Sequence, residues 1–338
     1  MRRMRCFLAT AVAASVVLTG CARREQAPPA PVEIPEAVEE AQQPVAARFT
    51  YSEKTSNAPV VVAVERGLYA EEGLKIEKQV VTGGIESAEA IVSGQADVAA
   101  LGDAPAIICM SRSPKVLLLA RLGDGERRHR IVVRRGAGIK RPADLAGKRL
   151  AVQHGSSTHG GLLLYLQEHK VDPASITLVS LSPRDFPEAM SAGQIDAAAG
   201  SAPWPQNVLA ACDNAEPFAN LEGLDNTYPV LLLAREEFAT EQPEAARAVV
   251  RATQAAAEWI DEHPQETADL ISVRSGVAPA REREMLKDYN FGTDLTRSVI
   301  DSLEMTAQFL KDQGRIDEVP DIDSQLALPD LLTEEEPS

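Results

Sequence analysis

Two well-separated segments of this chain carry nearly the same run of residues. Gly94 to Pro105 reads Gly-Gln-Ala-Asp, a short apolar stretch, then Gly-Asp-Ala-Pro; Gly193 to Pro203 reads Gly-Gln-Ile-Asp, an apolar stretch, then Gly-Ser-Ala-Pro. Each segment follows a helical pattern and reads as a glycine stop, a strand and a loop. The repeat predicts two similar α/β lobes with a Gly-x-Ala-Pro loop at the carboxyl end of one strand each; the alternative is a coincidence between alanine-rich segments.

The rest of the chain alternates in the same way. Further strands are expected at 46–52, 74–81, 116–122, 149–153, 176–180 and 228–234, and helices at 59–66, 85–93, 158–168, 186–191, 243–262, 265–273, 280–289 and 295–313. Strands alternating with helices at this spacing predict parallel sheets covered by helices. Ligands of such sheets bind beyond the carboxyl ends of the strands, so we expect the site in a cleft between the lobes.

The N-terminus has the pattern of an export signal. Arg2, Arg3 and Arg5 precede an apolar run, Phe7–Leu18, that is too short to span a bilayer comfortably. The run ends in Leu-Thr-Gly-Cys21, which resembles the lipobox of bacterial lipoproteins. We therefore expect a signal peptide at 1–20 and lipidation of Cys21, with an ordinary secretory signal as the alternative. Residues 21–45 are rich in proline and glutamate and predict a disordered tether.

The charge balance limits the partners. The formal net charge is −16, and removal of residues 1–20, which hold three arginines and no acids, takes it to −19. An acidic surface repels nucleic acid and anionic lipid, so neither is expected as a partner.

Cysteine spacing predicts no metal site. Without Cys6 of the signal and Cys21, the chain keeps Cys109 and Cys212, which have no metal-type spacing. We expect two buried thiols, with a single disulfide as the alternative in an oxidising compartment. No metal and no cofactor are expected.

Four segments resemble one family. Val64–Leu74 (Val-Glu-Arg-Gly-Leu-Tyr-Ala-Glu-Glu-Gly-Leu) resembles the Lys-Gly-Phe/Tyr-x-x-Glu-Gly-Leu segment of the substrate-binding proteins of ABC transporters that take nitrate, alkanesulfonates, taurine and thiamine-precursor-like ligands. Ser93–Asp97, Asp144–Lys148 and Gly155–Ser157 match further segments of that family. The resemblance runs from about Arg48 to Gln313.

The resemblance implies an α/β type II periplasmic-binding-protein fold with a ligand cleft between two lobes. Lobe one would hold 46–128 plus 227–338, and lobe two 129–226. The protein would be a monomeric extracytoplasmic lipoprotein, in the periplasm or on the outer face of the cell membrane. It would close on a small anionic or zwitterionic ligand by hinge motion and deliver it to an ABC permease and ATPase. Sulfonate, taurine or nitrate is the expected ligand; a pyrimidine vitamin precursor or a ligand-sensing receptor role is the alternative.

One candidate anion site lies where a strand ends and a helix begins. Helix N-termini present unpaired N–H groups and a partial positive charge. Gly155, Ser156, Ser157 and Thr158 stand at such a junction, and their amides and hydroxyls suit a sulfonate, nitrate, carboxylate or phosphate. The alternative is that Ser157 or Thr158 only caps the helix.

The two Gly-x-Ala-Pro loops supply further candidates. In lobe one, Gly102 and Ala104 would let backbone amides approach the ligand, while Asp103 would repel an anion unless it pairs with an amine or an arginine. That leaves room for a zwitterion such as an amino-sulfonate. In lobe two, Ser201 and Trp204 stand in the matching loop, and Trp204 either stacks on the ligand or packs against the lobe.

The loop after the first strand is a third candidate, because in the family it reaches the ligand. It contributes Ser52, Thr55 and Asn57. No arginine is placed clearly enough to pair with an anion, and Arg184 is expected at the surface.

The chain lacks the patterns of an enzyme. Gly155–His159 comes close to the Gly-x-Ser-x-Gly nucleophile elbow, but histidine replaces the last glycine. The five histidines form no metal-spaced cluster, and most are expected at the surface. An enzyme on the same fold would need a reactive side chain in the cleft, for which Cys109 is the one candidate nucleophile.

Overall fold

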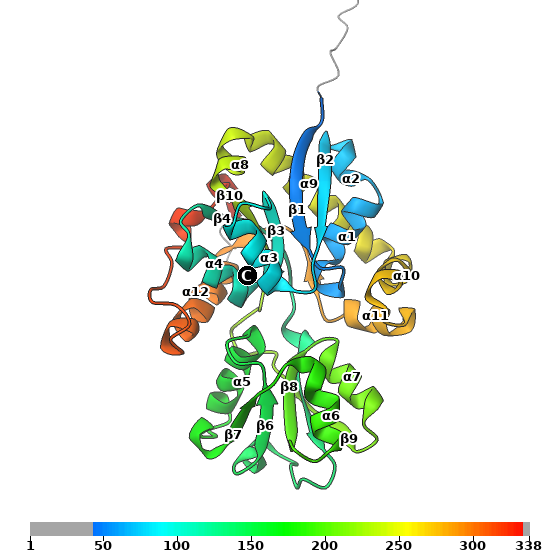
Figure 1. Ribbon diagram of the computed structural model, residues 1–338, viewed down its shortest axis with the longest axis vertical. Coiled ribbons are helices and arrows are strands. Elements are labelled where there is room, and N and C mark those ends of the chain that lie inside the picture. The colour runs from blue at the N-terminus through cyan, green and yellow to red at the C-terminus, as the bar shows by residue number, and fades with distance from the viewer. Residues whose placement is uncertain (1–42, 334–338) are drawn as a thin grey trace, which may run out of the picture. The chain divides into compact units, whose positions relative to one another are not determined.

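The computed structural model describes residues 43–333, which form two large β-sheets with helices on both faces of each and one small two-stranded sheet (Figure 1). The predicted signal peptide, Cys21 and most of the predicted tether lie outside the described residues. We call the part built on the six-stranded sheet lobe one and the part built on the five-stranded sheet lobe two. The lobe boundaries given above remain a proposal, which the strand membership of the two sheets supports.

Lobe one has the strand order β11-β4-β10-β3-β1-β2. Its strands are β1 (Val45–Tyr51), β2 (Leu74–Val80), β3 (Val98–Gly102), β4 (Val116–Asp124), β10 (Val230–Arg235) and β11 (Asn290–Phe291). Its helices are α1 (Ala58–Glu65), α2 (Leu68–Glu71), α3 (Gly84–Val92), α4 (Asp103–Arg112), α8 (Glu236–Glu241), α9 (Pro243–Glu262), α10 (Pro264–Ser275), α11 (Pro279–Leu286) and α12 (Arg297–Asp312). A separate parallel pair joins β12 (Leu295–Thr296) to β13 (Leu332–Thr333).

Lobe two has the strand order β7-β6-β8-β5-β9. Its strands are β5 (His129–Arg134), β6 (Arg149–Val152), β7 (Thr177–Ser180), β8 (Ala197–Ser201) and β9 (Ala215–Asn220), and its helices are α5 (Ser157–Glu168), α6 (Phe186–Ser191) and α7 (Trp204–Ala211). Short 3-10 turns connect several elements, including η1 (Thr55–Asn57), η2 (Glu126–Arg128) and η5 (Pro183–Asp185). Lobe two is drawn in green in Figure 1.

The two sheets repeat one topology, and both are mixed. In each, three parallel strands (β2-β1-β3 and β7-β6-β8) are followed by one strand that runs against them, β10 or β5. The next strand, β4 or β9, pairs antiparallel with that one. The prediction of parallel sheets is therefore confirmed for three strands of each sheet and wrong for the pairings of β10 and β5. The reason is the crossing between the lobes: β5 begins at His129, directly after η2, so it enters lobe two from the end where β6 and β8 finish and runs against them. Strands β5 and β9 were not among the strands expected from the sequence.

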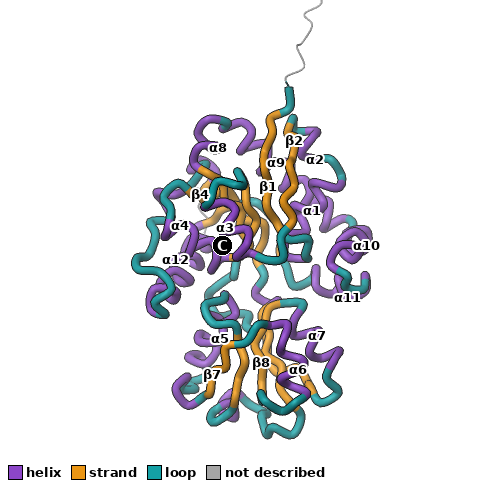
Figure 2. Tube along the Cα trace, in the orientation of Figure 1, coloured by secondary structure: helices purple, strands orange, loops and turns teal. Residues whose placement is uncertain are grey.

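Each sheet is buried on both faces, because helices pack on each face and alternate residues of the strands point toward them. Leu231 and Leu233 of β10 pack with α4 and α12, whereas Leu232 packs with α1 and α9 on the other face, and all three are 0% exposed. Figure 2 shows the helices, in purple, enclosing the orange strands of both lobes. In the described part of the chain, no helix is long and apolar enough to cross a bilayer.

The repeat predicted from the sequence corresponds to β3 and β8 with the segments that flank them. One detail differs from the prediction: Gly-Asp-Ala-Pro of lobe one is no loop, because Gly102 ends β3 and α4 begins at Asp103. In lobe two, Ser201 ends β8 and α7 begins at Trp204.

Candidate functional site

A cavity of about 450 Å³ lies between the lobes, with walls from both. We call it the interlobe cavity. Lobe one contributes the start of α3, the start of α4 and a residue beyond α12, and lobe two contributes the starts of β5, α5 and α7. The lining residues are Thr82, Gly83, Gly84, Ile85, Glu86, Gly102, Pro105, Ile108, Arg128, His129, Gln153, His154, Gly155, Ser156, Ser157, Thr158, Pro183, Ala199, Gly200, Ser201, Trp204 and Arg315.

The three hydroxyls at the start of α5 have different partners. Ser156 is the N-cap: its Oγ accepts from the N–H of His159 at 3.2 Å and donates to the carbonyl of Gln153 at 2.7 Å. Ser157 donates its hydroxyl hydrogen to Oδ1 of Asp103 in lobe one. Oγ1 of Thr158 lies 2.7 Å from Nδ1 of His129. The capping role expected for Ser157 or Thr158 is thus performed by Ser156.

Two arginines line the interlobe cavity, contrary to the expectation that none is placed to meet an anion. Arg128 is 6% exposed, and its Nη2 donates to the carbonyl of Tyr228 at 3.0 Å. Arg315 packs on Gly155 so closely that a Cβ there would lie 2.9 Å from its Nε; Gly155 also has φ +75°, a left-handed value that favours glycine. Arg184 is exposed and is not among the lining residues.

Glu86 is the one acidic side chain among the lining residues, and its oxygens are already bonded. They accept from the N–H and hydroxyl of Thr82 and from the N–H of Gly83 at 2.6 to 3.1 Å. These hydrogen bonds, first of all those from Thr82, hold the pKa of Glu86 below its ordinary value. The walls therefore present two arginines against one fully bonded carboxylate.

His129, which lines the cavity, and His159 of α5 are buried and neutral, so the expectation of surface histidines is wrong for these two. Burial, with the charge of Arg128, lowers the pKa of His129 well below 6.5. Burial, with His154 and Arg315, lowers the pKa of His159 to about 4. Nδ1 of His159 accepts the N–H of Gly155 at 3.1 Å, which fixes the glycine loop against α5.

The structure brings together seven of the twelve predicted ligand-binding residues. The seven that line the interlobe cavity are Gly102, Gly155, Ser156, Ser157, Thr158, Ser201 and Trp204; the five that do not are Ser52, Thr55, Asn57, Asp103 and Ala104.

Those five are buried for reasons of packing and hydrogen bonding. Thr55 donates to Oε2 of Glu282 at 2.5 Å, and Asn57 donates to the carbonyl and hydroxyl of Ser52 at 2.9 Å. Asp103 is 0% exposed, and besides Ser157 it accepts from the hydroxyl of Thr306 at 3.0 Å. Ala104 is also 0% exposed.

Sequence reasoning missed Arg128, His129, Arg315 and the turn from Thr82 to Glu86. Arg128 and His129 stand at the crossing into lobe two, and two charged or polar residues before an apolar strand were the available signal. Arg315 carries no such signal, because it reaches Gly155 only through the packing of lobe one on lobe two.

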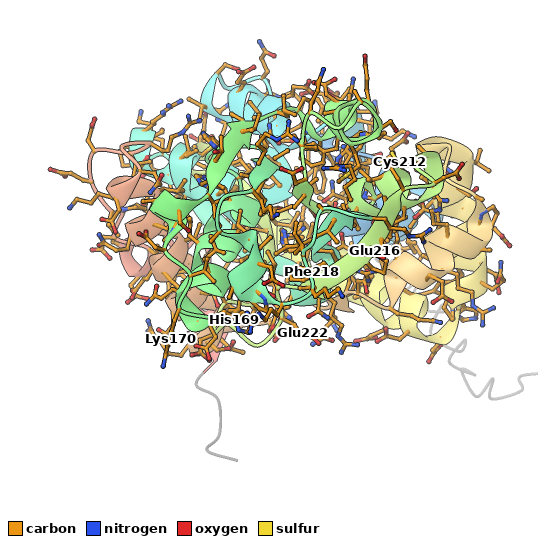
Figure 3. All side chains as sticks on the ribbon, turned by 90° about the horizontal axis from the view of Figure 1, so that it is seen from below. His169, Lys170, Cys212, Glu216, Phe218 and Glu222 are labelled. Carbon is orange, nitrogen blue, oxygen red and sulfur yellow. The ribbon has the colours of Figure 1, made fainter. Side chains whose placement is uncertain are left out.

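Cys109 and Cys212 are free and buried, as expected. Burial raises the pKa of the Cys109 thiol to about 12, so it is a poor nucleophile. Figure 3 views the molecule from below and labels Cys212 on one side of lobe two, away from His169 and Lys170. Within residues 43–333, no group of three or more His, Cys, Asp or Glu side chains is arranged to hold a metal ion.

Known proteins resemble this chain in sequence and in structure. A taurine-binding periplasmic protein of Escherichia coli (strain K12) is 28% identical over 299 residues, which cover 83% of this chain and 91% of that protein. The periplasmic aliphatic sulphonate binding protein SsuA from Escherichia coli superposes with a TM-score of 0.75 at 21% identity, covering 87% of this chain and 95% of that one. The alkanesulfonate-binding protein SsuA from Xanthomonas axonopodis pv. citri, bound to MOPS, superposes with a TM-score of 0.71 at 25% identity over 87% and 100%.

These likenesses confirm the predicted fold class, a periplasmic-binding-protein fold of two α/β lobes. They also confirm the family resemblance and place the chain among binding proteins and not among enzymes. Residues 54–267, more than half of the chain, match the family model described as NMT1/THI5 like. The chain belongs to the NMT1/THI5 like family.

Proposed function

We propose that this protein binds an alkanesulfonate in the interlobe cavity and delivers it to an ABC importer. The observation that carries the proposal is the set of hydrogen-bond donors around the cavity. Arg128, Arg315 and the start of α5 lie together on the walls of a protein whose formal net charge is −16. Such a local excess of donors suits an anion.

The size of the cavity and the state of the acids narrow the ligand. A cavity of about 450 Å³ is in the range of small organic ligands and far larger than nitrate requires. Asp103, which could have paired with the ammonium of taurine, is buried and holds two hydroxyls. Glu86 is bonded to Thr82 and Gly83. An anion with an uncharged organic part therefore fits these walls better than a zwitterion.

Taurine and 1-propanesulfonate form a matched pair for the test, because an ammonium replaces the terminal methyl. The protein is the chain from residue 21 onward with Cys21→Ser, and the measurement is calorimetric binding together with thermal unfolding. A ligand at about 100 times its Kd stabilises by about 2.7 kcal/mol, which raises Tm by several degrees. We expect this shift with propanesulfonate and a smaller one with taurine. Tighter binding of taurine would reverse the choice, and no binding of any sulfonate would refute the proposal.

We further propose that Cys21 carries the lipid anchor and that the body acts outside the cytoplasm, as its periplasmic relatives do. The export signal and the lipobox-like Leu-Thr-Gly-Cys21 support this. Mass spectrometry of the mature N-terminus should find an acylated Cys21, and Cys21→Ser should release the protein from membranes. Recovery of the uncleaved protein, still beginning at Met1, in the membrane-free extract would contradict the anchor.

Delivery would follow closure of the lobes around the anion at Gly155–Thr158, after which the closed form docks on a permease. ATPase activity of the reconstituted importer should then rise with liganded protein. A protein that binds sulfonate yet stimulates no importer would indicate a sensing receptor instead.

A further inference from the structure

Three residues that sequence reasoning did not connect form a continuous chain of contacts into the interlobe cavity. Nε of Arg128 lies 3.0 Å from Nε2 of His129, and Nδ1 of His129 lies 2.7 Å from Oγ1 of Thr158. All three side chains are more than nine-tenths buried, at 6%, 1% and 5% exposed, and all three line the cavity.

The chemistry of arginine sets the direction of this chain. A guanidinium can only donate, so Nε2 of His129 accepts and carries no hydrogen. The imidazole hydrogen then resides on Nδ1, which donates to Oγ1 of Thr158. His129 is thereby held as one neutral tautomer, and the ring of Tyr228 packs against it with centroids 4.7 Å apart.

The hydroxyl hydrogen of Thr158 must point away from His129. Within the described residues, His129 is the sole hydrogen-bond partner of Thr158 Oγ1. The other two hydroxyls of the same helix start are committed, Ser156 to the Gln153 carbonyl and Ser157 to Asp103. Thr158 is thus the hydroxyl here that can offer its hydrogen to a ligand.

We propose that His129 is a positioning residue, held by Arg128, that turns Thr158 into an obligate hydrogen-bond donor and so selects an anionic group without a proton. The inference rests on the proposed function and adds the basis of its specificity. A sulfonate has only acceptor oxygens and satisfies such a donor. A phosphonate that keeps one proton has an O–H group that needs an acceptor, and the acceptor side of Thr158 is already bonded to His129.

Binding by variants of the mature chain with Cys21→Ser tests the donor. Thr158→Val should weaken propanesulfonate binding by roughly tenfold to a hundredfold, because a hydrogen bond to a charged group is lost, and Thr158→Ser should restore it. Thr50→Val is the matched control: Thr50 is buried in β1, away from the cavity, and its Oγ1 has no partner in the described residues. It should leave the affinity unchanged. Equal affinity of Thr158→Val and the parent chain would overturn the inference while leaving the proposed function intact.

The ratio of the affinities for propanesulfonate and propylphosphonate tests the positioning role, because a merely structural role of His129 would not change this ratio. In mildly acidic buffer, where propylphosphonate keeps one proton, the parent chain should prefer propanesulfonate. His129→Phe removes the donor to Thr158 and should narrow that preference, and His129→Asn, which keeps a donor at the δ position, should restore part of it. An unchanged ratio in His129→Phe would overturn the inference. Failure of the parent chain to bind any sulfonate would instead refute the proposed function.

Nitrogen NMR of the five histidines tests the tautomer without any ligand. We expect His129 to carry its hydrogen on Nδ1 and His159, whose Nδ1 accepts the Gly155 N–H, to carry it on Nε2. His129→Phe and His159→Asn assign the two signals. A hydrogen on Nε2 of His129 in the parent chain would overturn the inference. This result is read from the parent chain, so it stands even if a variant used for binding fails to fold.

Discussion

The two copies of the repeat begin alike and end differently. At the start of each strand an aspartate holds the backbone and side chain of the neighbouring arginine: Asp97 accepts from N and Nε of Arg48 at 2.9 and 3.0 Å, and Asp196 accepts from N and Nε of Arg149, both at 3.1 Å. Hydrogen bonds from the arginine lower the pKa of both carboxyls, against the opposing effect of burial. The shared aspartate therefore stabilises the sheet in both lobes.

At the other end of the strand, the two copies differ at one position, which is Asp103 in lobe one and Ser201 in lobe two. Asp103 of lobe one is buried and accepts the hydroxyl of Ser157 from lobe two, so it joins the lobes. Ser201 of lobe two lines the interlobe cavity. The difference shows that matching positions of the repeat form a contact between the lobes in one copy and part of the cavity wall in the other.

The largest expected effect is on ligand binding, and it comes from replacing Ser201 of lobe two by aspartate, the residue that lobe one has at the matching position 103. Ser201→Asp places a carboxylate in the wall of the proposed anion site, and like charges at an interface cost several kcal/mol. Calorimetry should find propanesulfonate binding abolished, whereas the neutral Ser201→Ala should retain it. Undiminished binding by Ser201→Asp would show that the ligand lies elsewhere.

Removal of the shared aspartate should cost stability in either lobe. Asp196→Ala leaves Arg149 and Arg134 without their carboxylate and should lower the free energy of unfolding by about 3 kcal/mol, as for hydrogen bonds to a charged group. Asp97→Ala should cost a similar amount, and Asp261→Ala, at an exposed position of α9, should cost little. Urea unfolding checks all three, and a neutral effect of Asp196→Ala would contradict the role assigned to the repeat.

The reverse exchange should affect stability and affinity in opposite directions. Asp103→Ser removes the carboxylate that Ser157 and Thr306 contact, and should lower the free energy of unfolding by about 1–3 kcal/mol. It also removes a negative charge next to α5, so propanesulfonate should bind more tightly. Urea unfolding and calorimetry measure the two effects, and weaker sulfonate binding would mean that Asp103 serves the ligand directly.

The smallest expected effect is on the pH dependence of the free energy of unfolding, and it comes from His159 in lobe two. Because the pKa of His159 is about 4 in the folded protein and 6.5 otherwise, the unfolded chain binds more protons between these values. Its contribution to stability is present above pH 6.5 and is lost as the pH falls toward about 4. His159→Asn should make this fall shallower without abolishing it, since the pKa of His129 is lowered too. Urea unfolding at several pH values from 7 to 4 measures how the free energy of unfolding changes with pH. An identical change in the parent chain and in His159→Asn would contradict the assignment.

Most residues at the start of α5 could be predicted as site residues from the sequence, but the different hydrogen-bond roles of their hydroxyls could not. Gly155–Thr158 was recognisable because a strand, a glycine and a run of hydroxyls before a helix form a local pattern. The same pattern makes Ser156, Ser157 and Thr158 look equivalent. Their partners are Gln153, Asp103 and His129, of which two are distant in the chain, and these partners decide which hydroxyl can donate to a ligand.

The sequence by itself determined the two α/β lobes, the repeat that relates them and the start of α5, where we propose the anion site. Each depends on local periodicity and on glycines at element ends, which act over a few residues. Only the tertiary structure decided that Arg128 and Arg315 reach the interlobe cavity and that Asp103 does not. The direction of β5, the packing of Arg315 on Gly155 and the burial of Asp103 come from contacts between segments far apart in the chain, which no local pattern encodes.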